Sequence, residues 1–317
     1  MTKRIVFVSL LVILVVSILS GCGAVEDTRD KTKIVTTSFA VYDWICEILG
    51  EENGKFDVEL LSNGGDMHSY QPSAADIAKI HKCSLFVYGG GSSDEWTKKL
   101  LENTEINAVN LFQLVGESNW LMAEPYKHLD GHNHESHSDD AYDEHLWLSP
   151  KLAEKIVVGL LIKIQELDVQ NSSVYQKNAE AYIQRLDALS NEYQKSVDES
   201  EDKTVIFADR FPFLYLAKDY GINYYAAFPS CSSDTDASFD VVIELAEKAK
   251  ELEKETLLVL ENPTQSIAEA VIKASGCENI KTSVLDSCQS IAGKDAGNND
   301  YIEIMTKNLT SLKEALR

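Results

Sequence analysis

Five of the chain's seven histidines gather between residues 128 and 150, in the stretch HLDGHNHESHSDDAYDEHLWLSP. Neutral imidazole is a common ligand of zinc and its neighbours, and carboxylates extend the choice toward manganese. The stretch from His128 to His137 is rich in Gly, Ser and Asp and lacks apolar periodicity, which is typical of a loop that collects metal weakly or not at all. His145 differs, because the apolar run after it can anchor it against the core at the entry of a helix. The five histidines are His128, His132, His134, His137 and His145.

Three further residues with ligand chemistry stand near the ends of predicted strands. His68 lies between a strand and a helix, while Asp209 and Asp286 each end a strand. Ligands of open α/β sheets bind beyond the carboxyl ends of the strands, so these side chains could meet His145 around one divalent ion. Taken singly, each has an ordinary role as well. A histidine before a helix is commonly a surface or capping residue, and a strand-end Asp is commonly a helix N-cap.

Apolar runs that alternate with helical patterns indicate which elements must position these residues. The repeated β–α order predicts parallel sheets with helices on both faces. Residues 172–200 differ, because they form one uninterrupted helical pattern without Gly or Pro. Strands are predicted at 33–39, 56–62, 84–91, 106–112, 203–209, 222–228, 256–262 and 282–286. Other helices are predicted at 41–50, 73–83 (with Ser73 as N-cap and Asp76 at the third position), 150–167, 213–221, 238–252, 266–276 and 302–316.

This order of elements predicts an α/β fold with two parallel-sheet lobes joined by one long helix. We expect the metal site in the cleft between the lobes. The first lobe is predicted at 33–167 and includes the histidine-rich loop 128–137. The linking helix is predicted at 168–201 and the second lobe at 202–317.

The N-terminal residues predict export. Residues 1–21 combine a positively charged start, a short apolar core and small residues before a cleavage point, as in a signal peptide. Leu19-Ser20-Gly21-Cys22 resembles the bacterial lipoprotein box, which implies cleavage before Cys22 and a lipid on that residue. Residues 22–32 then form a polar tether. We expect an extracytoplasmic protein that is lipid-anchored to the bacterial cell membrane. The alternative, an N-terminal transmembrane anchor, places the chain on the same side.

The charge and the cysteine content argue against two further classes of function, nucleic-acid binding and a thiolate zinc cluster. A formal net charge of −22 repels nucleic acid and concentrates cations, so no nucleic-acid partner is expected. Apart from Cys22, five cysteines remain, an odd number that allows at most two disulfides. Cys277 and Cys288 are close enough in the sequence to pair. No CxxC occurs, which argues against a thiolate zinc cluster.

Several stretches, in the same order along the chain, resemble one family. The resemblance is to the metal-binding lipoproteins of bacterial ABC importers, in the zinc and manganese branch of the solute-binding proteins. It implies a metal in the cleft, handed to a membrane permease that a cytoplasmic ATPase drives. It also implies His68 and His145 as ligands from the first lobe and Asp286 from the second. We expect no catalysis, and a monomer. The stretches are KIVTTSFAVYDWICEILG, HSYQPSAADIAKI, GGGSSDEW, EHLWLSP, NAEAYIQRLDAL, LAKDYGI and SVLD.

One ligand of the zinc members has no counterpart in this chain. Those members carry a His after the strand matched by VIFAD, whereas this chain has no His after position 145. An ungapped match places Arg210 there, and arginine cannot bind a cation. We take Asp209 as the replacement, with Cys231 and Glu261 as alternatives. Arg210 could instead pair with Asp209 and leave an altered site.

Zinc is the expected metal, with manganese second, because a shared site of nitrogen and oxygen ligands binds zinc more tightly. Histidine-rich loops in the resembling family also occur chiefly in zinc importers. Two rival functions remain. A metallo-hydrolase would need HExxH or an open coordination position beside a base, and HExxH is absent. A binder of the same fold that has lost the metal and takes another solute is the second rival, since the third His is missing.

Overall fold

The computed structural model describes residues 31–317, except for 66, 124–141, 230–236, 263–264 and 278. The predicted signal peptide, Cys22, the loop 128–137 and Cys231 therefore lie outside the described residues, as does nearly all of the tether. Within the described ranges, no helix has the length and apolar character that a membrane crossing requires.

The first sheet contains four parallel strands in the order β2-β1-β3-β4. The strands are β1 (Thr32–Thr36), β2 (Phe56–Leu60), β3 (Leu85–Tyr88) and β4 (Ala108–Asn110). The helices between them are α2 (Phe39–Leu49), α3 (Ala74–Lys82) and α4 (Trp96–Glu102), and α5 (Leu111–Val115) and α6 (Pro150–Leu167) follow β4. Because all strands are parallel, their carboxyl ends share one edge, and His68 and the loop after β3 follow from that edge.

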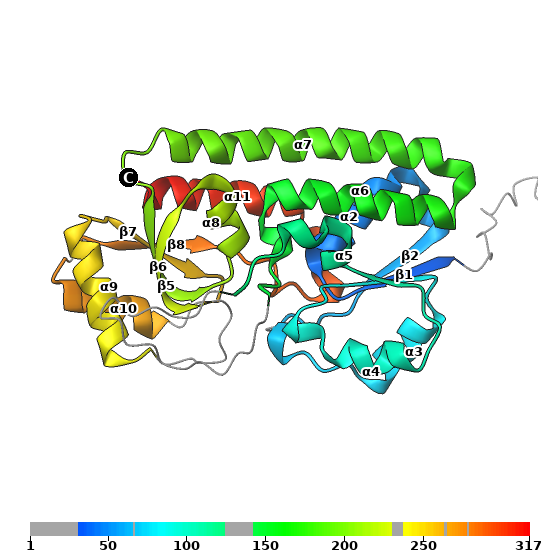
Figure 1. Ribbon diagram of the computed structural model, residues 1–317, viewed down its shortest axis with the longest axis horizontal. Coiled ribbons are helices and arrows are strands. Elements are labelled where there is room, and N and C mark those ends of the chain that lie inside the picture. Colours follow the sequence, from blue (N-terminus) through cyan, green and yellow to red (C-terminus); the bar gives the residue numbers. More distant parts are fainter. Residues whose placement is uncertain (1–30, 66, 124–141, 230–236, 263–264, 278) are drawn as a thin grey trace, which may run out of the picture. The chain divides into compact units, whose positions relative to one another are not determined.

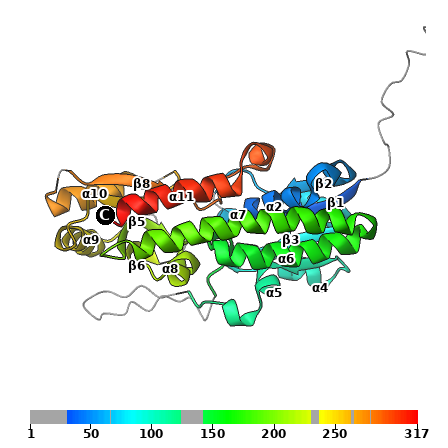
Figure 2. The same ribbon diagram turned by 90° about the horizontal axis from the view of Figure 1, so that it is seen from above.

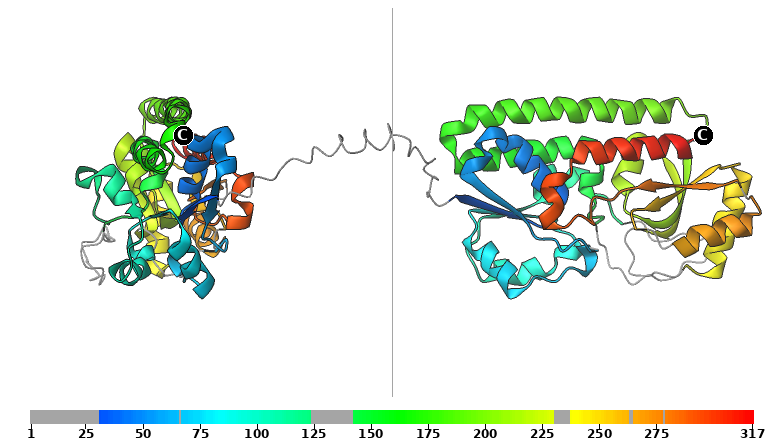
Figure 3. Two further views of the ribbon diagram at one scale, coloured as in Figure 1. Left: turned by 90° about the vertical axis from the view of Figure 1, so that its right-hand side faces the viewer. Right: turned by 180° about the vertical axis from the view of Figure 1, so that it is seen from behind.

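The second sheet repeats this arrangement with the strand order β6-β5-β7-β8, again all parallel. The strands are β5 (Thr204–Phe211), β6 (Asn223–Pro229), β7 (Thr256–Leu260) and β8 (Lys281–Leu285). The helices are α8 (Leu214–Tyr220), α9 (Phe239–Glu251), α10 (Gln265–Ser275) and α11 (Tyr301–Ala315). Figure 3 shows α11 on one side of this sheet and α9 and α10 on the other.

Helix α7 (Ser172–Asp198) runs past both sheets (Figure 1). Its 27 residues correspond to a rod of about 40 Å. The helix contacts α2 and α6 of the first lobe and α8 and α11 of the second, and Figure 2 shows it lying between α6 and α11. One stripe at three- and four-residue spacing is buried: Tyr175, Ala179, Tyr182, Leu186, Leu189 and Tyr193. The predicted two-lobed α/β fold with one long joining helix is confirmed.

Alternating side chains in the strands separate an inner core from two outer ones. In β5, Val205 and Phe207 join the inner core, whereas Ile206 and Ala208 face α9 and α10. The first sheet divides in the same way: alternate strand residues enter the inner core, and the others pack in an outer cluster beside α3 and α4. The inner core is continuous, because residues of α2, α6, α7, α8 and α11 all belong to it.

Two short helices of the first lobe differ from the prediction. The run 106–112 was expected to be one strand, but β4 ends at Asn110. The Asn110 side chain accepts a hydrogen bond from the Gln113 amide, and the Gln113 side chain accepts one from the Asn110 amide. This capping box starts α5 where the apolar pattern alone continued the strand. Helix α4 was not predicted either, because the glycine-rich residues before it indicate a loop.

Candidate metal site

His145 is held at the entry of the segment that leads into α6. Its side chain is fully buried, and its Nδ1 lies 2.9 Å from Oδ1 of Asp143, which also accepts the His145 backbone amide at 3.0 Å. A carboxylate only accepts hydrogen bonds, so Nδ1 carries the ring proton and Nε2 presents its lone pair. This is the tautomer that a metal ligand needs.

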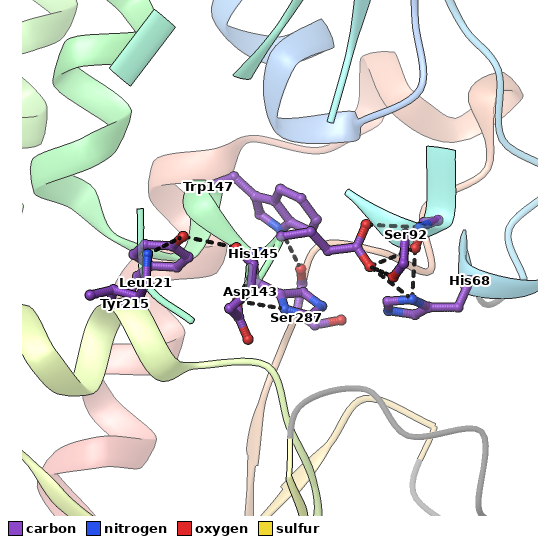
Figure 4. A network of polar contacts seen from close by, with 10 residues as sticks. His68, Ser92, Leu121, Asp143, His145, Trp147, Tyr215 and Ser287 are labelled. Carbon is purple, nitrogen blue, oxygen red and sulfur yellow. Dashed lines mark hydrogen bonds and ion pairs between the residues drawn. The ribbon is translucent and has the colours of Figure 1, made fainter. Parts of the chain in front are cut away.

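Contacts from the second lobe fix the segment around His145. Tyr215 of α8 donates a hydrogen bond to the Asp143 carbonyl at 2.8 Å and accepts one from the Leu121 amide at 3.2 Å. Trp147 donates from Nε1 to the Ser287 carbonyl at 2.9 Å. Tyr301 of α11 donates to the Trp147 carbonyl at 2.6 Å. Figure 4 shows the contacts of Tyr215 and Trp147 around the histidine, which is therefore positioned by both lobes.

His68 lies in a 3-10 turn, Met67–Ser69, that follows β2. Its Nδ1 is 2.7 Å from Oγ of Ser93 and 3.2 Å from Oε1 of Glu144, and its Nε2 is buried. The His68 and His145 rings have centroids 5.5 Å apart (Figure 4). Two imidazoles bound to one zinc ion at Zn–N distances of about 2.0–2.1 Å have centroids about 5 Å apart. The two predicted first-lobe ligands are thus brought together at a separation that suits one metal ion.

Asp286 and Glu261 follow the neighbouring strands β8 and β7. Asp286 accepts the Cys288 amide at 2.7 Å through Oδ1. Glu261 accepts bonds from the Ser287 amide and hydroxyl at 2.7 and 2.6 Å and from the Ser290 hydroxyl at 3.0 Å. Burial raises the pKa of both carboxyls, and the nearby charge of Asp286 raises that of Glu261 further. A cation at this place would favour the ionised form of both groups.

Asp209 lies within β5 rather than at its end, because the strand continues to Phe211. Its Oδ1 accepts the Arg210 amide at 2.8 Å, and its Oδ2 accepts the Leu260 amide of β7 at 3.4 Å. Nε of Arg210 lies 3.9 Å from Asp209 Oδ1, so the pair foreseen as an alternative is present. These contacts engage the Asp209 carboxylate within its own sheet, and its role as the replacement ligand stays a prediction. Cys231 lies outside the described residues.

In the part of the chain that the structure describes, no three His, Cys, Asp or Glu side chains are arranged to hold one metal ion together. Within the described residues, the first lobe therefore presents a pair of imidazoles, and Asp209, Glu261 and Asp286 do not join them in one such group. The four cysteines in the described ranges, Cys46, Cys83, Cys277 and Cys288, form no disulfide with one another, so Cys277 and Cys288 are not bridged.

Residues next to the predicted ligands complete the first-lobe site. Glu144 accepts hydrogen bonds from Ser92 and Ser93 and contacts His68. Burial raises the pKa of Glu144, but its hydrogen bond with His68 and, when His145 is protonated, the charge of that imidazole outweigh burial and lower the pKa to about 2. Glu144 and Ser93 were not predicted from the sequence. In the sequence, Glu144 is marked only by its place beside the predicted ligand His145 in EHLWLSP. Ser93 is marked only by its place after a strand, in GGGSSDEW.

Two parallel α/β lobes spanned by one long helix, with paired imidazoles in the first lobe, define a metal-binding solute-binding protein. The chain belongs to the family described as zinc-uptake complex component A, periplasmic (ZnuA), whose model matches residues 34–315.

Named relatives agree with this assignment. The chain is 32% identical over 300 residues to the zinc-binding lipoprotein AdcA of Streptococcus pneumoniae serotype 4, covering 93% of this chain and 58% of AdcA. It is 28% identical over 296 residues to the high-affinity zinc uptake system protein ZnuA of Bacillus subtilis, covering 93% of this chain and 90% of that protein. The chain thus spans little more than half of AdcA but nearly all of the Bacillus protein.

Solved structures show the same fold. The Zn(II)-bound ZnuA-like domain of Streptococcus pneumoniae AdcA superposes with a TM-score of 0.69 at 29% identity, covering 90% of this chain and 99% of that one. The metal-dependent lipoprotein YcdH of Bacillus subtilis superposes with a TM-score of 0.71 at 26% identity, covering 90% of this chain and 100% of that one.

Proposed function

We propose that this protein captures Zn²⁺ outside the cytoplasm and delivers it to an ABC permease driven by a cytoplasmic ATPase. The observation that carries the proposal is the pair of imidazoles of His68 and His145. Their ring centroids lie 5.5 Å apart, and the Nδ1 atom of each contacts a carboxylate. That arrangement directs both Nε2 lone pairs away from the carboxylates, as zinc ligands require. Relatives named as zinc-binding and zinc-uptake proteins support the same metal.

The proposed ligands are His68 and His145 from the first lobe and Asp286 from the second. Asp209 is the proposed fourth ligand, with Cys231 and Glu261 as its alternatives. The three hydrogen bonds that Glu261 accepts weigh against it, because both of its oxygens are engaged. Zinc is preferred over manganese, since two imidazoles raise the affinity of a site for zinc. No catalytic step is assigned, in keeping with a family of transport components.

The acidic surface and the proposed anchor fit this task. A net charge of −22 raises the local concentration of cations around the protein. A lipid on Cys22 would keep a monomer at the outer face of the bacterial membrane, within reach of the permease. Capture and release would then need no covalent chemistry in the protein.

Zinc titration of three variants tests the proposal. His68→Ala and His145→Ala should each lower zinc affinity about 100-fold or more, because each removes a ligand. His81→Ala, at an exposed histidine of α3, is the matched control and should leave the affinity unchanged. The affinity is measured by competition with a chromophoric chelator, together with the zinc-dependent rise in melting temperature. A wild-type protein whose melting is unaffected by zinc or by chelation would support a binder of another solute instead.

The fourth ligand is assigned by comparing Asp209→Asn, Cys231→Ser and Glu261→Gln in the same titration. The variant that weakens zinc binding while leaving the melting temperature of the zinc-free protein unchanged identifies the ligand. If Asp209→Asn binds zinc as the wild type does, Asp209 is removed from the proposed set. Repeating the melts with Mn²⁺ separates the two metals.

A further inference from the structure

We infer that Glu144 is a positioning residue for the zinc site, which fixes the ring and the tautomer of His68. This inference rests on the proposed function. Glu144 lies directly before His145, but its side chain contacts Ser92, Ser93 and His68. It therefore links the two histidines through its backbone on one side and its carboxylate on the other.

The Glu144 carboxylate holds two separate segments together. Its Oε1 accepts hydrogen bonds from the Ser92 and Ser93 hydroxyls at 3.0 and 2.9 Å and lies 3.2 Å from His68 Nδ1. Its Oε2 accepts the Ser93 amide at 3.1 Å. The side chain is only 6% exposed, so these contacts are made largely out of water. The turn that carries His68 and the loop after β3 are thus tied to the segment that carries His145.

The direction of the hydrogen bonds sets the tautomer of His68. The Ser93 hydroxyl has one proton and lies within reach of both the carboxylate and His68 Nδ1, which is 2.7 Å away. A carboxylate can only accept, so the Ser93 proton goes to Glu144 and its oxygen accepts from the ring. Nδ1 therefore carries the proton, and Nε2 presents a lone pair to a metal.

The glycine-rich loop after β3 is shaped around this carboxylate. A Cβ on Gly91 would collide with the Cβ and carboxylate of Glu144. On its other side the loop is held by the buried Asp94, which accepts the Gly89 and Gly90 amides at 2.7 and 3.3 Å. Gly91 thus leaves room for Glu144, and the loop presents Ser92 and Ser93 to it. Since donors engage both of its oxygens, Glu144 is assigned to positioning and not to the metal.

Two variants separate the role of the Glu144 carboxylate from that of the Ser93 hydroxyl. Glu144→Gln keeps the shape of the side chain but replaces one acceptor oxygen by a donor, so it cannot satisfy His68, both hydroxyls and the Ser93 amide by acceptance. We expect loss of the Nδ1–H tautomer of His68 and zinc affinity weakened about 10- to 100-fold. Ser93→Ala removes the hydroxyl but keeps the carboxylate, so we expect the Nδ1–H tautomer to persist. Glu95→Gln, at an exposed carboxylate on the same loop, is the matched control.

Long-range ¹H–¹⁵N correlation spectra of the zinc-free protein report the tautomer, with His68 assigned by comparison with His68→Ala. The zinc affinity is measured by chelator competition. The inference is overturned if Glu144→Gln keeps both the wild-type tautomer and an affinity within about twofold of Glu95→Gln. Loss of the tautomer in Ser93→Ala with its retention in Glu144→Gln would assign the role to the serine. If the wild type binds no zinc, the proposed function fails, while the tautomers still decide the role of Glu144.

Discussion

Asp43 of α2 should make the stability of the protein fall as the pH rises. It is buried against α7, where Tyr182 donates a hydrogen bond to its Oδ2 at 3.1 Å. Burial, followed by the nearby charge of Asp300, raises the pKa of Asp43 to about 7. The ordinary value for Asp is about 3.9, so the difference corresponds to roughly 4 kcal/mol of free energy of unfolding.

The sign follows from proton counts. Between about pH 4 and pH 7 the folded protein keeps the Asp43 proton and the unfolded chain has lost it. Unfolding therefore releases a proton, and raising the pH favours the unfolded state. In Asp43→Asn the Tyr182 hydroxyl still has an acceptor, and no proton is exchanged. We expect the stability difference between variant and wild type to grow by roughly 4 kcal/mol across this window and to level off above it.

Urea unfolding of the zinc-free protein at pH values from 4 to 8 measures this difference. Asp57→Asn, at an exposed position of β2, is the control and should follow the wild type at every pH. Other buried carboxyls titrate in the same range, including Asp94, whose pKa burial raises to about 6, but they are common to all three proteins. Parallel profiles for Asp43→Asn and the wild type would refute the reasoning.

Two further predictions concern the metal site. Zinc affinity should fall steeply as the pH drops from 7 to 5, because protons compete for the imidazoles of His68 and His145; a titration with equal affinity at both pH values would contradict a two-histidine site. Deleting residues 128–137 should leave the affinity for the first zinc equivalent unchanged and remove only weak additional ions, which equilibrium dialysis counts; loss of the first equivalent would place the main site in that loop instead.

Features set by neighbouring residues were predictable from the sequence. The Ser73 N-cap and Asp76 form the expected capping box, and the helix predicted at 150–167 has those bounds. The long joining helix followed from the unbroken periodicity of residues 172–200. Each of these depends on spacings of three or four residues, which a single sequence displays directly.

Features set by distant residues were not predictable in this way. Glu144 meets Ser92 and Ser93, which are 52 and 51 residues away, so nothing local announced the contact. Asp209 was placed at a strand end, but β5 continues past it, with a shift of register between Phe207 and Arg210. That irregularity lies in the pairing with β6, and the Asp209 carboxylate accepts the Leu260 amide of β7.

The continuous inner core limits how an ion can be exchanged. Side chains from both lobes, among them Trp147, Tyr215, Leu285 and Tyr301, belong to one buried cluster along α7. A separation of the two lobes that exposed about 400 Å² of this apolar surface would cost about 10 kcal/mol. That is as much as the entire free energy of unfolding of a typical domain. For the proposed zinc carrier, this cost favours loading and unloading by small rearrangements of loops and side chains at the rim. A permease that receives the ion as proposed would need to loosen a few ligands, not to pull two lobes apart.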